Sequence, residues 1–428
     1  MPVRKSRWLY LSIFCIVNLF AGSLYAWSVF SGPLASKLSA VSGHPVTSAE
    51  LGVIFSIASA VNPFAMIAGG WVNDRFGARA VIPAGGLMIG GGLLLSSMAT
   101  TISELMLFYG VIFGLGVGLT YTATIGSSIK FFPDRRGLAG GVASMSYGFG
   151  SIVLPPVASA VIAAFGIEQT LFMLGCVCGS VIVIGGLLSK KCPDNIVEII
   201  IGRRCAEGSV PTPQKASAEA ETGDMNWKAM LSTPVFWCML AFFITGSTGA
   251  LMLISSASTI AQQQAGASVS AAAAAVSVLA VMNAVGRIGG GLASDRFGRI
   301  PALLMSLSLA TAGLLILLTA GKGDFILFVC GISLLGMCYG GFVGIYPGFT
   351  VDQFGAKYNS VNYGIMAAGF SLGGILGPWL LRSFASEGDY SGAYTAALAV
   401  CAAGFAFAAL CTKLRVGRSL KKMAASTV

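Results

Sequence analysis

One charged residue stands inside a long apolar stretch of the sequence, at Arg287. The surrounding residues 276–296 are apolar enough and long enough to cross a bilayer, and they end at Asp295-Arg296. Arg287 lies eight residues before Asp295, which is roughly 12 Å along a helix in a hydrocarbon core about 30 Å thick. An ionisable side chain at that depth is costly and marks a functional site by default. Its planar guanidinium group matches a carboxylate bidentately, which makes Arg287 a candidate anion-binding residue.

Polar residues near Arg287, or in matching spans, are candidates for the same binding site. Asn283 precedes Arg287 by four residues and shares its helix face, so it can orient the guanidinium group or donate to a substrate oxygen. Tyr121 and Tyr339 could close the site, and Tyr25 and Tyr147 are further candidates. Each tyrosine by itself is equally consistent with ordinary packing.

The residues that enzymes and metal sites need are missing or scattered. The ten cysteines fall mostly inside apolar runs without metal-type CxxC pairs, so we interpret them as small packing residues. The single histidine, His44, lies beside Pro45 in a predicted loop. No nucleophile–base pair is apparent, so the sequence predicts neither an enzyme nor a bound metal or cofactor.

The composition is that of an integral membrane protein. The 428 residues are 55% hydrophobic and only 10% charged, whereas soluble domains carry about 25% charged residues. The 57 glycines suit helices that pack closely in lipid. The formal net charge of +10 could indicate nucleic acid as a partner, but the basic residues occupy short segments between apolar spans. We therefore interpret the charge as a topology signal and expect a lipid bilayer, and no nucleic acid, as the environment.

Apolar segments predict an all-α integral membrane protein with twelve transmembrane helices in two pseudo-symmetric six-helix bundles. The predicted spans are 8–32, 50–73, 79–98, 104–130, 138–164, 167–189, 232–261, 268–294, 300–320, 325–350, 358–384 and 391–414. The corresponding domains are an N-terminal bundle at 1–189, a polar linker at 190–230, a C-terminal bundle at 231–415 and a tail at 416–428.

The distribution of basic residues predicts the orientation of the spans. With the N-terminus in the cytoplasm, 22 of the 26 Lys and Arg residues fall in cytoplasmic ends and loops. Only Lys37, Lys322 and Arg382 fall on the opposite side, and Arg287 lies within the membrane. Positively charged loops remain inside, so we expect a protein of the cell's inner membrane with the linker and both termini in the cytoplasm.

The sequence repeats itself across the linker. The segment Gly70–Gly77 (GWVNDRFG) follows the second span, and Gly291–Gly298 (GLASDRFG) follows the eighth, 221 residues later. A second repeat, with an offset of 218 residues, relates Asp134 to Asp352 and Tyr121 to Tyr339. Two related six-helix halves joined by a polar linker are the plan of a secondary transporter, with substrate near the midplane between the halves.

The two GxxxDRFG segments resemble the signature of the major facilitator superfamily. In that family the aspartate and arginine act as a cytoplasmic latch. The resemblance therefore implies that charged residues after the spans hold one conformation closed. The residues assigned to this latch are Asp74, Arg75, Asp295, Arg296, Asp134, Arg135 and Asp352.

Finer motifs resemble the bacterial oxalate/formate antiporter and monocarboxylate transporter group. They are Arg7-Trp8 with Gly22, Tyr25 and Trp27, the segment 131–139 (FFPDRRGLA), and Asn362-Tyr363-Gly364. In that group an arginine in the eighth helix binds the substrate carboxylate, and Arg287 falls on it. The second cation of the oxalate exchanger, a lysine in the eleventh helix, is absent from residues 365–371 (IMAAGFS). The aspartate of animal monocarboxylate transporters is replaced by Asn283.

The count of buried charges selects the substrate class. One buried cation balances one carboxylate, whereas a dianion would leave a negative charge unpaired in a medium of low dielectric constant. The expected function is transport of a small monocarboxylate such as lactate or pyruvate, by a chain that acts as a monomer. Proton symport is implied by the resemblance alone. The proton could travel on the substrate as the neutral acid, or on an aspartate at a cytoplasmic helix end.

Three alternatives remain open at this point. The first is an anion exchanger, such as an oxalate/formate antiporter. The second is a transporter-like sensor that binds ligand without flux. The third is a drug-efflux protein, although a pocket of broad specificity has little need of a bidentate anion clamp.

Overall fold

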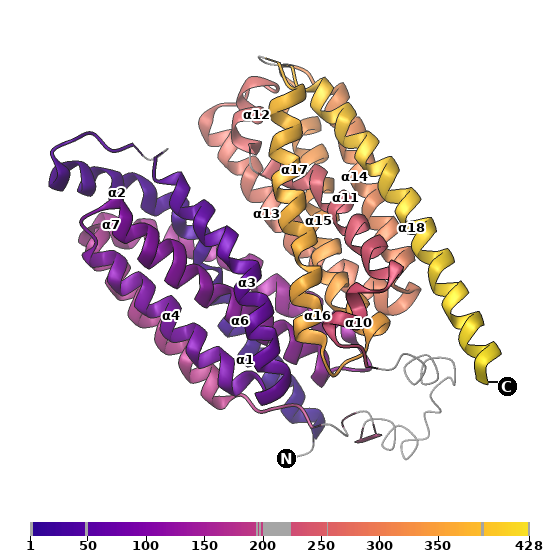
Figure 1. Ribbon diagram of the computed structural model, residues 1–428. Helices are drawn as coiled ribbons and strands as arrows, with labels where there is room; N and C mark the ends of the chain where they lie inside the picture. The colour runs from indigo at the N-terminus through magenta and orange to yellow at the C-terminus, as the bar shows by residue number, and fades with distance from the viewer. Residues whose placement is uncertain are drawn as a thin grey trace. The chain divides into compact units, whose positions relative to one another are not determined.

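A computed structural model describes most of the chain, and nearly all of the described residues are helical (Figure 1). It describes residues 3–47, 50–193, 196, 198–199, 224–254, 256–386 and 389–426, with side chains left out at 3–5, 25, 42 and 415–426. The chain divides into two compact units. The first unit comprises Met1–Asp224 and Thr350–Ile365, and the second comprises Met225–Phe349 and Met366–Val428. Most of the predicted linker lies outside the described residues, and the domain boundaries stay a prediction.

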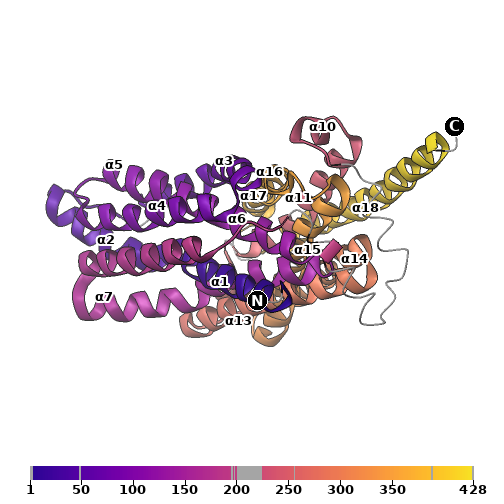
Figure 2. The ribbon, with the colours of Figure 1, turned by 90° about the horizontal axis from the view of Figure 1, so that it is seen from below.

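The first unit is a bundle of apolar helices that run side by side in both ribbon views (Figures 1 and 2). Its α-helices are α1 (Val3–Ala21), α2 (Trp27–Ser42), α3 (Gly52–Phe76), α4 (Ala78–Met98), α5 (Ile102–Leu105), α6 (Gly114–Phe131) and α7 (Arg136–Leu188). The 3₁₀-helix η1 (Gly22–Ala26) joins α1 to α2, and the π-helix η2 (Met106–Phe113) joins α5 to α6. Both departures from α-helix fall inside predicted spans.

Helix α7 supplies two spans rather than one. Its 53 residues would extend about 80 Å as a straight helix, far more than a bilayer requires. Gly166 has φ 81° and ψ 170°, so the chain turns there, between the predicted spans 138–164 and 167–189. Among the described residues, eleven helical segments are long and apolar enough to cross a membrane. Counting α7 twice gives twelve spans.

The second unit is also a bundle of helices, which lie side by side in Figure 1. Its helices are α10 (Trp227–Leu231), α11 (Pro234–Ile254), α12 (Ala257–Gln263), α13 (Val269–Phe297), α14 (Arg299–Thr319), α15 (Phe325–Phe354), α17 (Ala368–Phe384) and α18 (Ser391–Ser426). The last turn of α15, from Thr350, groups with the first unit, as does α16 (Asn359–Met366) up to Ile365. The backbone of 416–426, predicted as a tail, continues α18.

The repeated sequence motif is a repeated backbone turn. Helix α3 ends at Gly77 with φ 84°, and α13 ends at Gly298 with φ 92°. A residue with a Cβ atom is strained at such a positive φ, whereas glycine adopts it readily. Each glycine therefore lets the chain leave one membrane helix and begin the next, α4 or α14, after a single residue.

Aromatic side chains fill the interior of both bundles, and large apolar side chains cover the outside. In the first unit the Tyr109 ring stacks on Phe113, with ring centroids 4.4 Å apart. In the second unit Tyr346 stacks on Phe243 at 3.9 Å. Phe64 and Ile326 are 72% and 78% exposed. Such a surface would be costly in water over a large area and is suited to lipid.

Candidate functional site

Arg287 and Asn283 form a hydrogen-bonded pair on α13. The Nε–H group of Arg287 donates to Oδ1 of Asn283 over 3.2 Å. Arg287 is only 3% exposed, and Asn283 is half-buried. Because the two residues are four apart on one helix, the pair forms along the helix surface without any contribution from the loops. The bond holds the guanidinium plane against the helix.

Helix α15 approaches the backbone of this pair through a row of glycines. A Cβ atom at Gly336 would lie 2.8 Å from the carbonyl oxygen of Leu279. A Cβ atom at Gly340 would collide with the carbonyl oxygen of Asn283, and one at Gly344 with that of Arg287. Three glycines spaced four apart therefore let α15 lie directly on the turns of α13 that carry the pair. We call these three glycines the glycine seam.

The glycine seam was missed in the sequence analysis, although its signal was present. The spacing G-x3-G-x3-G in an apolar helix is typical of close helix–helix packing in membranes. Tyr339, a predicted site residue, directly precedes Gly340 in the seam and is 9% exposed. The second unit thus holds Arg287, Asn283 and Tyr339 on two helices in direct contact.

The other predicted tyrosines lie in the first unit. The rings of Tyr121 on α6 and Tyr147 on α7 meet edge to face, with centroids 4.9 Å apart and planes at 60°. Both tyrosines are buried, at 7% and 8% exposure. A Cβ atom at Gly22 would lie 2.5 Å from the carbonyl oxygen of Tyr147, so η1 crosses α7 closely at this point. Tyr25 belongs to η1, but its side chain lies outside the described residues.

A buried polar network beside Tyr121 was also not predicted. Asn18 on α1 donates from Nδ2 to the carbonyl oxygen of Ala143 over 2.9 Å. Its Oδ1 accepts from the hydroxyl of Thr124 over 2.7 Å. Asn18 and Thr124 are both fully buried. The network ties α1, α6 and α7 together with polar groups that each have a partner, as a buried amide requires.

Asp74, a predicted latch residue, binds the beginning of α16. Its carboxylate accepts from the backbone N–H groups of Ser360 and Val361, each over 3.1 Å. It also pairs with Lys130, whose Nζ lies 2.6 Å from Oδ1. The N-terminus of a helix carries partial positive charge, so a carboxylate is favourable there. The neighbouring Asn73 donates to the hydroxyl of Ser360 over 2.8 Å.

Two further ion pairs involve predicted latch aspartates but arginines that were not predicted. Arg7 donates from both Nη atoms to Asp134, over 2.7 and 3.3 Å, and lies over the Phe132 ring at 4.7 Å. Arg136 donates to Asp352 over 2.8 Å. In the described part of the chain, no ion pair involves Arg135.

The latch residues of the repeated motif make local contacts. Arg75 lies over the Trp71 and Phe76 rings, at 5.8 and 5.4 Å. Arg296 lies over the Phe297 ring at 5.3 Å. Asp295 pairs with Arg299, which directly follows the motif, over 2.9 Å. Arg299 also donates to the hydroxyl of Ser294 over 2.6 Å.

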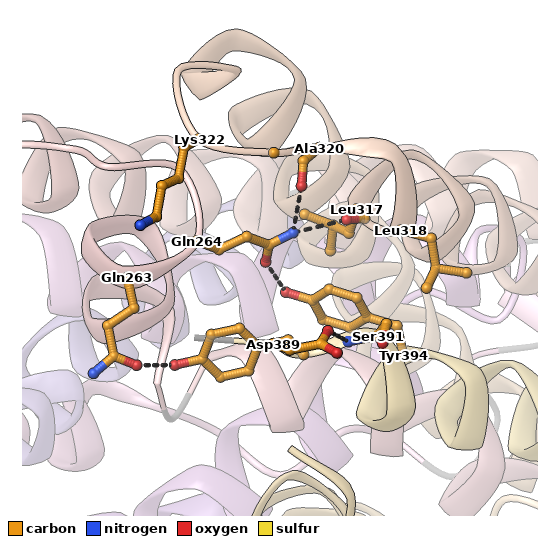
Figure 3. Close-up of a pocket in the computed structure, with 11 residues that line it drawn as sticks. Gln263, Gln264, Leu317, Leu318, Ala320, Lys322, Asp389, Ser391 and Tyr394 are labelled. Atoms are coloured by element: carbon orange, nitrogen blue, oxygen red, sulfur yellow. Dashed lines mark hydrogen bonds between the residues drawn. The ribbon is translucent and has the colours of Figure 1, made fainter. Parts of the chain in front are cut away.

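A polar hollow of about 180 Å³ opens at one end of the second unit, between α12, α14 and α18 (Figure 3). Tyr390 donates to Oε1 of Gln263, and Tyr394 donates to Oε1 of Gln264 over 2.6 Å. Gln264 in turn donates to the carbonyl oxygens of Leu317 and Ala320, over 2.9 and 2.8 Å. The polar groups around this hollow mostly hold its three walls together.

One carboxylate at the edge of the hollow caps α18. Oδ1 of Asp389 accepts from the backbone N–H of Ser391 over 2.9 Å. This hydrogen bond holds the pKa of Asp389 below its ordinary value, because it favours the ionised form. No group of three or more His, Cys, Asp or Glu residues suited to a metal ion occurs among the described residues.

Comparisons with known proteins bear on the whole chain. The family model described as Major Facilitator Superfamily matches residues 9–378 and 252–425. The oxalate:formate antiporter of Oxalobacter formigenes is 25% identical over 420 residues, 98% of this chain and 94% of that protein. Monocarboxylate transporter 9 of Pongo abelii is 35% identical over 142 residues, 32% of this chain and 28% of that protein.

Solved structures share the fold at low sequence identity. A double-tryptophan mutant of XylE covers 96% of both chains with a TM-score of 0.75, at 14% identity. The likeness confirms the predicted fold class, an all-α membrane protein with twelve helices in two six-helix bundles. The family match and the relatives confirm the resemblance inferred from the repeated motif and from the finer motifs.

Proposed function

Because the chain belongs to the major facilitator superfamily, we propose that it is a secondary transporter that carries small monocarboxylates together with a proton. Lactate and pyruvate are the type of substrate intended. The single observation that carries this proposal is the buried Arg287, hydrogen-bonded through Nε to Asn283. In the proposed site the edge formed by the two Nη atoms meets the substrate carboxylate as a bidentate pair.

Charge balance supports a monocarboxylate. Arg287 is the one Lys or Arg residue in the sequence that lies deep within a predicted span. One carboxylate neutralises it, whereas a second carboxylate would be desolvated without a countercharge. Asn283 turns the guanidinium group and adds an amide N–H that suits the hydroxyl of lactate or the keto oxygen of pyruvate. Tyr339, which precedes Gly340 in the glycine seam, is the tyrosine of the second unit that we assign to the proposed pocket, and Tyr121, Tyr147 and Tyr25 remain predicted binding residues.

The proposed orientation follows the charge distribution. The chain spans the inner membrane with both termini and the linker in the cytoplasm, because 22 of its 26 basic residues then lie on the cytoplasmic side. In this orientation Asp74, Asp134, Asp295 and Asp352 are all cytoplasmic. We propose that the contacts of Asp74 with α16 and of Arg136 with Asp352 hold the cytoplasmic side closed, and that they separate when access alternates.

Uptake into proteoliposomes tests the proposal. Labelled L-lactate should accumulate when a pH gradient is imposed, and Arg287→Ala should abolish accumulation. Arg287→Lys keeps the charge but loses the planar fork, so it should retain only a small part of the activity. Arg382→Ala, which removes an exposed arginine at the end of α17, is the matched control and should transport normally. An unaltered rate in Arg287→Ala would exclude this site.

Anion exchange is the second candidate, and the nearly full-length match to an oxalate:formate antiporter favours it. An exchanger requires substrate on the opposite side of the membrane and responds little to a pH gradient. Liposomes loaded with unlabelled formate, oxalate or lactate distinguish the two modes. Counterflow that is independent of pH supports exchange, and accumulation in unloaded liposomes supports symport. Saturable binding without either flux would indicate a sensor.

A further inference from the structure

Two cysteine sulfurs from helices far apart in the sequence lie almost within bonding distance. Cys238 is in the first turns of α11, and Cys411 is in α18, 173 residues later. Their Sγ atoms are 2.8 Å apart. A disulfide bond is about 2.05 Å long, so a displacement of less than about 1 Å would bring the sulfurs to bonding distance. Cys238 is 5% exposed and Cys411 is fully buried.

Neighbouring contacts hold both cysteines in this arrangement. The Cys238 thiol also lies 3.2 Å from the carbonyl oxygen of Phe407, one turn before Cys411 on α18. The next residue of α11, Met239, accepts from the Tyr346 hydroxyl over 2.7 Å, and the Tyr346 ring stacks on Phe243 of α11. Helix α11 is therefore fixed against both α15 and α18.

We propose that Cys238 and Cys411 are a redox modification site, at which a peroxide-class oxidant forms a disulfide that joins α11 to α18. The sulfur of Cys238 attacks the peroxide, the O–O bond breaks, and Cys238 becomes a sulfenic acid as one water leaves. The sulfur of Cys411 then attacks the Cys238 sulfur, the S–O bond breaks, and a second water leaves with the proton of Cys411. Two thiols are oxidised by two electrons, and one peroxide is reduced to two waters.

The position of the pair fits a reversible modification. In the proposed orientation α11 begins, and α18 leaves the membrane, on the cytoplasmic side. Glutathione keeps thiols reduced in that compartment, and disulfides there are typically transient. Both cysteines belong to the second unit. The crosslink therefore stiffens one bundle and leaves motion of one bundle against the other unhindered, so transport should continue in the oxidised protein.

Peptide mapping of the purified full-length protein tests this inference directly. The protein is treated with hydrogen peroxide, remaining thiols are alkylated in denaturant, and the digest is analysed by mass spectrometry. A linked pair of peptides that contains Cys238 and Cys411, two hydrogens lighter than the reduced peptides and restored by dithiothreitol, is expected. Complete alkylation of both cysteines after oxidation, or linkage of either one to a different cysteine, would overturn the proposal.

Matched variants separate the modification from general oxidation. Peroxide should raise the apparent Tm of the wild type, because a disulfide between α11 and α18 constrains the unfolded chain. Cys238→Ala and Cys411→Ala should each lose both the linked peptides and this rise. Cys176→Ala removes an exposed cysteine and should retain both. If the alanine variants fail to fold, the wild-type map alone decides. The measurement does not depend on any substrate, so it stands or falls separately from the proposed transport function.

Discussion

At the residue scale, the bond between Arg287 and Asn283 distinguishes this site from one built on an arginine–carboxylate pair. Asn283 accepts from the guanidinium group without cancelling its charge. A carboxylate in the same place would neutralise Arg287 and compete with an anionic substrate. The neutral amide therefore adds no negative charge beside Arg287 and does not compete with an incoming carboxylate.

The substitution Asn283→Asp tests whether the neutral side chain of Asn283 matters for substrate binding. The new acid would lie beside Arg287, so it would introduce a titratable group that pairs with the guanidinium group when ionised. We expect weaker lactate affinity at neutral pH and a steeper dependence of uptake on pH than in the wild type. The measurement is KM and Vmax for uptake between pH 5 and 8. If the profile and KM match the wild type, Asn283 does not face the substrate.

Spacing along one helix was enough to predict this pair, whereas the partners of the predicted latch aspartates could not be predicted. Residues four apart on a helix share a face whatever the tertiary structure. Which arginine reaches Asp134 or Asp352 depends on how separate helices are rotated and on where they end. The sequence presents Arg135 and Arg136 side by side, and only the turn before α7 determines that Arg136 reaches Asp352.

At the element scale, the glycine seam determines how closely α15 can approach α13. Gly340→Ala places a methyl group against the carbonyl oxygen of Asn283. The helices must move apart, so we expect a loss of about 1–3 kcal/mol of stability and a large loss of uptake, because the turns that carry Asn283 and Arg287 shift. Thermal unfolding in detergent and initial uptake rates measure the two effects.

Gly289→Ala is the control for that substitution. Gly289 lies in α13, the helix that Gly340 of α15 contacts, but a Cβ atom at Gly289 meets no other atom within 4 Å. The variant should match the wild type in uptake and should be equal or slightly more stable, since alanine favours the helix. Equal damage from both substitutions would mean that any change of glycine in these helices is harmful, and the seam would have no special role.

The N-terminus of α18 gives a pH-dependent prediction. The pKa of Asp389 is lowered by its hydrogen bond from Ser391. A lowered pKa in the folded state means that the ionised form stabilises the fold above the ordinary pKa, near 3.9, and that this contribution is lost as the pH falls. Asp389→Asn keeps an acceptor oxygen but removes the charge, so it should lower the Tm at pH 6.

The same variant supplies its own internal check. Once the pH falls below the lowered pKa of Asp389, the wild-type carboxyl is protonated as well, so the difference in Tm between wild type and Asp389→Asn should shrink towards zero. Other carboxyl groups titrate equally in both proteins and cancel in the comparison. A difference that stays constant as the pH is lowered through the titration of Asp389 would show that the charge of Asp389 does not stabilise α18.

Most of the elements could be predicted from apolar length, but their internal breaks could not. Segment length and polarity predicted twelve spans, because lipid requires about 20 apolar residues in each. The 3₁₀ turn η1 and the π-helix η2 lie inside such spans and do not change their apolar character. The grouping of 350–365 with the first unit depends on contacts such as that of Asp74 with α16, which no local pattern predicts.

At the scale of the whole molecule, the proposed alternation of access requires contacts that are made in one state and broken in the other. The pair of Arg136 and Asp352 has the required character. Arg136 precedes the fifth span and Asp352 follows the tenth, and the two charges lie 2.8 Å apart. Arg136→Asp or Asp352→Arg alone should reduce the initial uptake rate several-fold, because a coupling of about 1–3 kcal/mol is lost.

The combined charge reversal, Arg136→Asp with Asp352→Arg, restores opposite charges and should recover a large part of the rate. The same exchange at Lys37 and Glu168 is the control. That pair is 2.8 Å long, but Glu168 is 62% exposed, and such surface pairs contribute little. If the double reversal at 136 and 352 is as slow as the worse single variant, the pair does not act as a latch.

Helix α7 has a further consequence for how the protein is made. The chain turns between its fifth and sixth spans at Gly166, inside one continuous helical segment, with Phe165 and Ile167 on either side. Successive membrane spans are usually separated by a hydrophilic loop outside the helices. The turn at Gly166 lies inside the helical segment, so no such loop separates the fifth span from the sixth. We therefore expect residues 136–188 to leave the translocon together as one helical hairpin.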